Sequence, residues 1–179
     1  MLKKLALLFI VLALFPVDNI WASTFYARLN GFIDYGHVPS VKSALKKAKE
    51  DDTVIITINS QGGMMEAGDE IRAAIKKSKG KVVAEIKGNA FSEAAFIAIA
   101  CHDVKGKGTV MFHVGFMVDE YGDTGVPAGL TRKSLASVKP ILTTNEYNRM
   151  AKGKDIFMSV DVLRERTCKA WKKGCVNAA

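Results

Sequence analysis

Three residue types that hydrolases use for acyl transfer occur in order along the middle of the chain. A glycine pair, Gly62-Gly63, is followed by Ser92 and then by His113. A serine hydroxyl can attack a carbonyl carbon when a histidine accepts its proton, and backbone N–H groups can stabilise the oxyanion that forms. The set therefore predicts serine-based hydrolysis, provided that the fold brings these positions together.

Each of these residues also has a purely structural interpretation. Ser92 precedes an apolar helical segment and could serve only as its N-cap. The glycine pair could mark a junction that needs positive φ angles, and His113 could simply end a strand. No single residue decides between these alternatives.

The hydropathy pattern predicts alternating strands and helices, and hence an α/β fold of stacked βαβ units with a mostly parallel sheet. Strands are expected over residues 25–33, 53–58, 82–86 and 109–113, and helices over 40–48, 64–77 and 92–100. The unbroken apolar run at 53–58 is typical of a strand buried on both faces. Ligands gather at the carboxyl ends of parallel strands, which is where the glycine pair, Ser92 and His113 fall.

The remainder of the domain is less regular. Residues 115–133 are glycine-rich and are expected to form a long loop. A helix over 134–150 should break or kink at Pro140, a short strand is expected over 154–158, and Ser159 should cap a final helix.

In this order the motifs resemble the proteolytic subunit of the Clp protease (ClpP), a family with a ClpP/crotonase-like fold. The resemblance is carried by the runs INSQGG (58–63), AG (67–68), GNAFSEAAF (88–96) and VMFH (110–113). It implies that Ser92 is the nucleophile, that His113 is the general base, and that the N–H groups of Gly63 and Glu93 form an oxyanion hole. It also implies that an extended peptide binds beside Gly62 and Gly63.

The sequence departs from that family at two functional positions. The expected aspartate of the triad falls at Ala151, so we assign the nearest carboxylate, Asp155, with Asn145 and Asn148 as neutral alternatives. The residue after the nucleophile is Glu93, whose charge would oppose a developing oxyanion unless its side chain points to solvent.

The first 22 residues have the pattern of a signal peptide. Lys3 and Lys4 precede an apolar run from Leu5 to Phe15, and a small residue, Ala22, ends the segment. This run is shorter than the ~17–25 residues of a membrane-spanning helix. We therefore expect cleavage before Ser23, a single domain over 23–179, and export across the inner membrane into the periplasm, with an uncleaved anchor as the alternative.

An oxidising compartment permits disulfides, and we predict one between Cys168 and Cys175, whereas Cys101 is expected to be a buried thiol. No metal site is expected, because there is no Cys-x-x-Cys pair and the histidines are scattered. The net charge of +8 comes from lysines spread along helix faces without interleaved aromatic residues, so we expect no nucleic-acid partner.

We therefore predict an exported, ATP-independent serine peptidase that acts on peptides or unfolded polypeptides and needs no cofactor. As in the family that it resembles, it should form a homo-oligomer, but no ATPase partner is expected outside the cytosol. The alternative is a catalytically impaired protein of the same fold that binds peptides or supports assembly. An acyl-thioester enzyme of the crotonase type is less compatible with Ser92 and His113.

Overall fold

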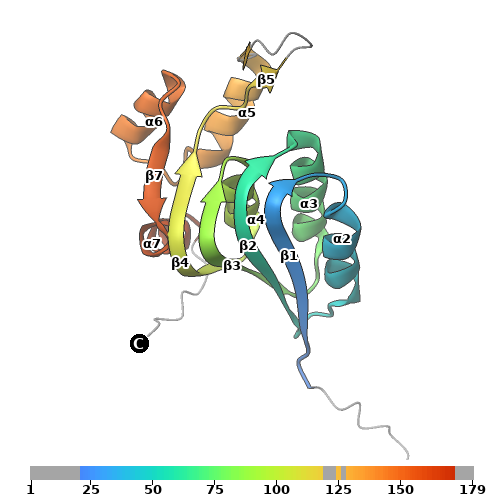
Figure 1. The fold of residues 1–179 in the computed structure, drawn as a ribbon. Coiled ribbons are helices and arrows are strands. Elements are labelled where there is room, and N and C mark those ends of the chain that lie inside the picture. Colours follow the sequence, from blue (N-terminus) through green and yellow to red (C-terminus); the bar gives the residue numbers. More distant parts are fainter. Residues whose placement is uncertain (1–20, 119–123, 126–127, 172–179) are drawn as a thin grey trace, which may run out of the picture.

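A computed structural model describes residues 21–118, 124–125 and 128–171 of the chain (Figure 1). Its main sheet has five strands in the order β1-β2-β3-β4-β7. These strands are β1 (Thr24–Ile33), β2 (Thr53–Gly63), β3 (Lys81–Phe91), β4 (Asp103–Phe112) and β7 (Ile156–Ser159). The first four strands are parallel and β7 is antiparallel to β4, which confirms the predicted α/β fold with a mostly parallel sheet.

Helices α2 (Val38–Lys47), α3 (Met65–Lys77) and α4 (Glu93–Ala100) connect successive parallel strands and lie on one side of the sheet (Figure 1). Along β2 the fully buried Val54, Ile56 and Ile58 alternate with half-buried residues. The expectation that this strand is buried on both faces is therefore wrong for the described part of the molecule, because helices cover one face only.

Three of the parallel strands are longer than predicted. Strands β2 and β3 continue through the glycine and polar residues that follow their apolar runs. Strand β4 contains Gly106 and Gly108. A Cβ atom on Gly106 would lie 2.1 Å from the Ile86 carbonyl oxygen, and one on Gly108 would lie 1.7 Å from that of Gly88. These glycines permit close approach to β3, so β4 begins before the strand expected over 109–113.

Beyond β4 the chain forms more regular structure than expected. Residues 115–133 include β5 (Met117–Val118) and β6 (Thr124–Gly125), which pair antiparallel, and the start of helix α5 (Ala128–Val138). The helix expected over 134–150 is two helices, because the chain turns around Pro140 before α6 (Thr144–Ala151). A capping box between Thr143 and Glu146 begins α6.

The starts of two helices differ in how well they agree with the sequence-based expectation. Helix α7 (Val160–Trp171) begins after Ser159, whose hydroxyl accepts a hydrogen bond from the Val162 N–H at 3.3 Å, as predicted. Helix α2 begins at Val38, before the helix expected over 40–48, so Ser40 lies within its first turn and donates to the His37 carbonyl. Pro39 is compatible with that earlier start because the first helical N–H groups need no intrahelical acceptor.

Several predictions concern residues outside the described ranges. Almost all of the expected signal peptide lies there, as does Cys175, so cleavage before Ser23 and the disulfide with Cys168 stay predictions. Cys101 is buried, as expected, with its Sγ 3.5 Å from the Ile97 carbonyl oxygen. Within residues 21–118, 124–125 and 128–171, no helix is long and apolar enough to cross a membrane.

Candidate active site

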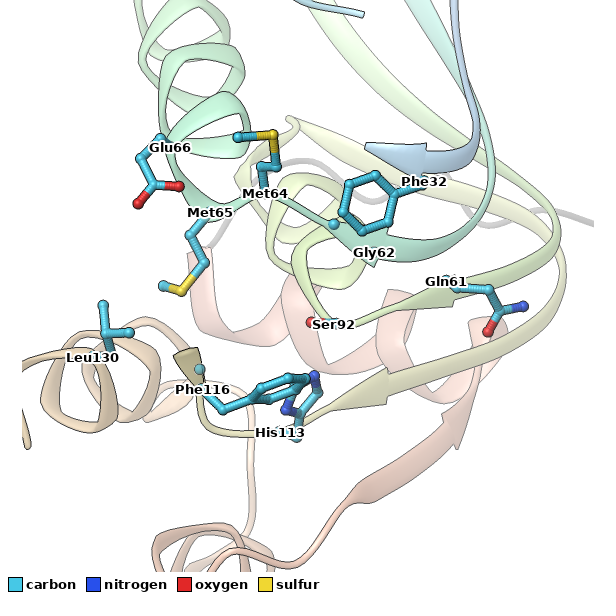
Figure 2. Close-up of a pocket in the computed structure, with 12 residues that line it drawn as sticks. Phe32, Gln61, Gly62, Met64, Met65, Glu66, Ser92, His113, Phe116 and Leu130 are labelled. Atoms are coloured by element: carbon cyan, nitrogen blue, oxygen red, sulfur yellow. The ribbon is translucent and has the colours of Figure 1, made fainter. Parts of the chain in front are cut away.

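A cavity of about 570 Å³ opens at the carboxyl ends of the parallel strands (Figure 2). Gly62, Gly63, Ser92 and His113 all contribute to its wall, so the fold brings these four predicted positions together. The wall has an apolar part, formed by Phe32, Met64, Met65, Phe116 and Leu130, and it also includes Gln61, Glu66 and Gly115. The cavity is large enough for one or two side chains of an extended peptide.

Ser92 connects β3 to α4 with an unusual backbone conformation. Its φ of 52° and ψ of −125° make it the one non-glycine residue with positive φ in the described part of the chain. It occupies the N-cap position of α4, yet its hydroxyl accepts no hydrogen bond from the helix. The capping interpretation of Ser92 is therefore wrong, and its hydroxyl is left available at a strained strand-to-helix turn, a geometry similar to the nucleophile elbow of α/β-hydrolases.

The turn at the end of β2 packs directly against Ser92. Gly62 has φ 101°, and a Cβ atom there would lie 2.6 Å from the Ser92 Cβ and 3.2 Å from the Glu93 nitrogen. Gly63, with φ 156°, would instead place a Cβ atom 2.2 Å from the Ile33 carbonyl oxygen. Both glycines are therefore required, Gly62 by the nucleophile turn and Gly63 by the neighbouring strand β1.

Ser60 holds this turn in place. Its hydroxyl donates to the Gly31 carbonyl at 2.5 Å and accepts from the Gly62 N–H at 3.0 Å. Ser60 is 1% exposed and Gly62 is buried, so the Gly62 N–H would otherwise be buried without this partner. The hydroxyl therefore joins the ends of β1 and β2 beneath the cavity.

His113 follows β4 and lies half-buried beside Phe116, with ring centroids 5.5 Å apart. Its Nδ1 is 2.7 Å from the Val114 carbonyl oxygen. A carbonyl can only accept, so Nδ1 carries the proton and Nε2 is left as the basic nitrogen. Within the described residues no hydrogen bond joins Ser92 to His113, although both groups face one cavity.

The predicted acid, Asp155, forms no hydrogen bond or ion pair with His113 within the described residues. Strands β4 and β7 pair up to Phe112 and Ile156, and His113 and Asp155 are the next residue on each strand. Asp155 is exposed and, within the described chain, forms neither a hydrogen bond nor an ion pair. The neutral alternatives Asn145 and Asn148 are exposed on α6. In this arrangement the Val114 carbonyl takes the position that a triad carboxylate would occupy.

The Glu93 side chain points into the protein, not to solvent. It is 2% exposed, and its carboxylate forms an ion pair with Arg72 of α3. A Cβ atom on Gly68 would lie 1.9 Å from its Oε1 atom, so α3 leaves space for this carboxylate. Burial raises the pKa of Glu93 to about 8, against the opposing effect of Arg72.

The N–H of Glu93 begins α4 and has no acceptor within that helix. It lies beside Gly62, on the side of the turn that carries Ser92. The side chain and the N–H of Glu93 thus have different surroundings: the carboxylate is buried between helices, and the N–H adjoins the nucleophile turn.

Sequence reasoning missed three contributors to this site. Ser60 stands within the quoted INSQGG run, but no local pattern indicates that its hydroxyl binds across to β1. From the sequence, Arg72 is indistinguishable from the other cations on solvated helix faces. Val114 contributes only its backbone carbonyl, which no side-chain pattern indicates. The apolar wall could have been suspected from Met64-Met65, which directly follow the glycine pair.

Comparison with known protein families bears on this geometry. Residues 37–120 match the Clp protease family. The matched range contains the glycine turn, Ser92 and His113, and it ends before Asp155. The match covers a little less than half of the chain and shows that this segment is similar to the Clp protease family. No curated protein matches the chain.

Proposed function

We propose that this protein is a serine peptidase that cleaves extended polypeptides through an acyl-enzyme on Ser92. The observation that carries the proposal is the Ser92 turn, where a strained, non-capping serine shares a cavity with His113. The match of this segment to the Clp protease family supports it independently.

In the proposed reaction His113 Nε2 takes the proton of the Ser92 hydroxyl as Oγ attacks the peptide carbonyl carbon. The resulting oxyanion is stabilised by the N–H groups of Gly63 and Glu93, and His113 then protonates the leaving amine. Water, activated by the same imidazole, hydrolyses the acyl-enzyme and releases the acid product. The Val114 carbonyl keeps Nδ1 protonated throughout, so Nε2 starts each half-reaction as a base.

The apolar part of the cavity wall favours substrates with apolar side chains next to the scissile bond. Phe32, Met64 and Phe116 are each at least 37% exposed, so they are available to a bound peptide. We propose cleavage beside large apolar residues, and we further propose export to the periplasm and activity without an ATPase.

A fluorophosphonate probe tests the mechanism, because it forms a bond to an activated serine. We expect wild-type protein to be labelled at Ser92, and Ser92→Ala and His113→Ala to abolish labelling. Ser43→Ala, on the exposed face of α2, is the control and should label as wild type does. Intact-mass measurement and peptide mapping identify the modified residue.

One alternative is a peptide-binding module, which would need no Ser92–His113 hydrogen bond, and none is present within the described residues. Catalytic hydrogen bonds are often long in structures without substrate, so the geometry alone does not favour that module over the enzyme. Wild-type protein that is never labelled but still binds apolar peptides would overturn the peptidase and support the module.

A further inference from the structure

Four charged side chains form a series of ion pairs that runs from Glu93, the residue after Ser92, to helix α5. Glu93 of α4 pairs with Arg72 of α3, and the second guanidinium nitrogen of Arg72 pairs with Asp69 on the same helix. The other carboxylate oxygen of Asp69 pairs with Lys133 of α5. Three helices beside the cavity are thereby joined through charges that the proposed chemistry does not use.

We propose that Arg72, Asp69 and Lys133 are positioning residues, which couple the docking of α5 to the placement of Ser92. The inference rests on the proposed function, because it assigns a role in the same site. It predicts that the nucleophile is correctly placed only when α5 is docked against α3.

The Glu93–Arg72 end of this series of ion pairs is rigid. Glu93 is covalently next to Ser92, and its carboxylate fills the space above Gly68, so movement of either helix displaces the nucleophile turn. Arg72 is 19% exposed and its Cζ lies 5.9 Å from the centre of the Phe96 ring, which holds the guanidinium against α4. Removing one partner of a buried ion pair is costly, because the other charge is left without compensation.

The Asp69–Lys133 end of this series of ion pairs is adjustable. Asp69 is 40% exposed and Lys133 is 48% exposed, so their ion pair by itself contributes little to stability. Helix α5 also contacts the body through Ser134, whose hydroxyl accepts from the Gly115 N–H at 3.3 Å, and Leu130 of α5 lines the cavity. Loss of the Lys133 contact should therefore shift α5 without unfolding the protein.

The charges around Glu93 support the coupling. Arg72 and Lys133 lower its pKa, whereas burial, Asp69 and Glu66 raise it. These groups come from α3 and α5, the two helices that the series of ion pairs joins to α4. Removal of the Lys133 charge should raise the pKa of Glu93 further, which would favour a neutral carboxyl that binds Arg72 less strongly.

The test compares Lys133→Gln with Arg132→Gln, a neighbouring exposed cation on the same helix that forms no ion pair within the described residues. Lys133→Gln should slow fluorophosphonate labelling of Ser92 by about two- to fivefold, the range that loss of an exposed ion pair can produce by weakening the docking of α5. Lys133→Arg keeps the charge and should restore most of the rate. Arg132→Gln should label as wild type does.

Two further readouts do not require activity. The pKa of Glu93, followed by carbon NMR of its carboxyl group, should rise in Lys133→Gln and stay unchanged in Arg132→Gln. The backbone amide shift of Ser92 should change in the first variant only. If the wild type is never labelled, the peptidase proposal fails, and these spectra still test the coupling.

Unchanged labelling in Lys133→Gln, in a protein whose wild type is labelled, would overturn the inference. An unchanged Glu93 pKa or an unchanged Ser92 amide shift would overturn it equally, whatever the activity. Equal effects of Lys133→Gln and Arg132→Gln would show that the loss of any positive charge on α5 is sufficient. The series of ion pairs would then not be the cause, and the inference would be overturned.

Discussion

At the scale of single residues, Ser92 combines a backbone conformation that non-glycine residues rarely adopt with a hydroxyl that the helix does not use. Such a conformation costs about 1–3 kcal/mol and persists only where surrounding contacts enforce it. Those contacts come from Gly62, which approaches the turn, and from the Met111 carbonyl, which accepts from the Ser92 N–H at 2.9 Å.

Substitution of Gly62 should therefore displace the nucleophile. Gly62→Ala introduces a Cβ 2.6 Å from that of Ser92 at φ 101°, and we expect labelling of Ser92 to fall at least about tenfold. Gly153→Ala is the matched control, because Gly153 also has positive φ, 76°, but has open space around it. Equal labelling of the two variants would show that the close approach of Gly62 to Ser92 does not limit the reaction.

The role of Asp155 can be measured directly. Because Nδ1 of His113 already donates to the Val114 carbonyl, Asp155→Asn should change the labelling rate by no more than about twofold. A triad that loses its carboxylate typically loses about 10⁴ in turnover. Lys154→Gln, at the adjacent exposed position, controls for altered surface charge. A loss approaching 10⁴ in Asp155→Asn alone would identify Asp155 as the triad acid.

At the scale of elements, the site depends on how the strand ends are joined. Strands β1 and β2 pair in parallel, but their register shifts between Asn30 and Phe32, where β1 approaches the glycine turn. Ser60 bridges this irregular region through Gly31 and Gly62. A side-chain hydroxyl thus supplies hydrogen bonds where the regular ladder is interrupted.

Ser60→Ala should lower the free energy of unfolding by about 1–3 kcal/mol, because the buried Gly62 N–H loses its partner and the link to the Gly31 carbonyl is removed. Urea denaturation measures this change. Ser43→Ala, on the exposed face of α2, should stay within about 0.5 kcal/mol of wild type. If the two variants are equally stable, the Ser60 hydroxyl does not hold the strand ends together.

At the scale of the whole molecule, one buried carboxyl should make stability depend on pH. The pKa of Glu93 is about 8 in the folded protein against an ordinary value of 4.5. The folded state therefore keeps a proton that the unfolded chain has lost, and the free energy of unfolding falls as pH rises through this window. Below the window both states are protonated, and this contribution does not change.

Glu93→Gln removes that titration, so its stability should decline less than that of wild type between about pH 5 and pH 8. The difference should grow with pH and reach on the order of a few kcal/mol, as expected for a shift of this size. Urea denaturation at several pH values tests it, with Glu70→Gln as an exposed control on α3. Parallel stability curves for Glu93→Gln and wild type would show that Glu93 stays ionised in the fold.

Much of this fold could be predicted from local patterns, and the errors have a common cause. The order of strands and helices, the burial of Cys101 and the cap at Ser159 follow from hydropathy and neighbouring residues. The strand expected over 109–113 begins earlier, at Asp103, and includes Gly106 and Gly108, because β3 lies too close there for any side chain. That closeness is a property of two strands, not of one segment.

The sequence by itself determined that a glycine turn, a serine and a histidine follow successive strands, because parallel βαβ units place all strand ends at one edge. Only the tertiary structure decided the conformation of Ser92, the choice of the Val114 carbonyl as the partner of His113, and the burial of Glu93 against Arg72. Residue type and spacing specify which element carries a group. Contacts between elements distant in sequence decide its conformation, partner and charge.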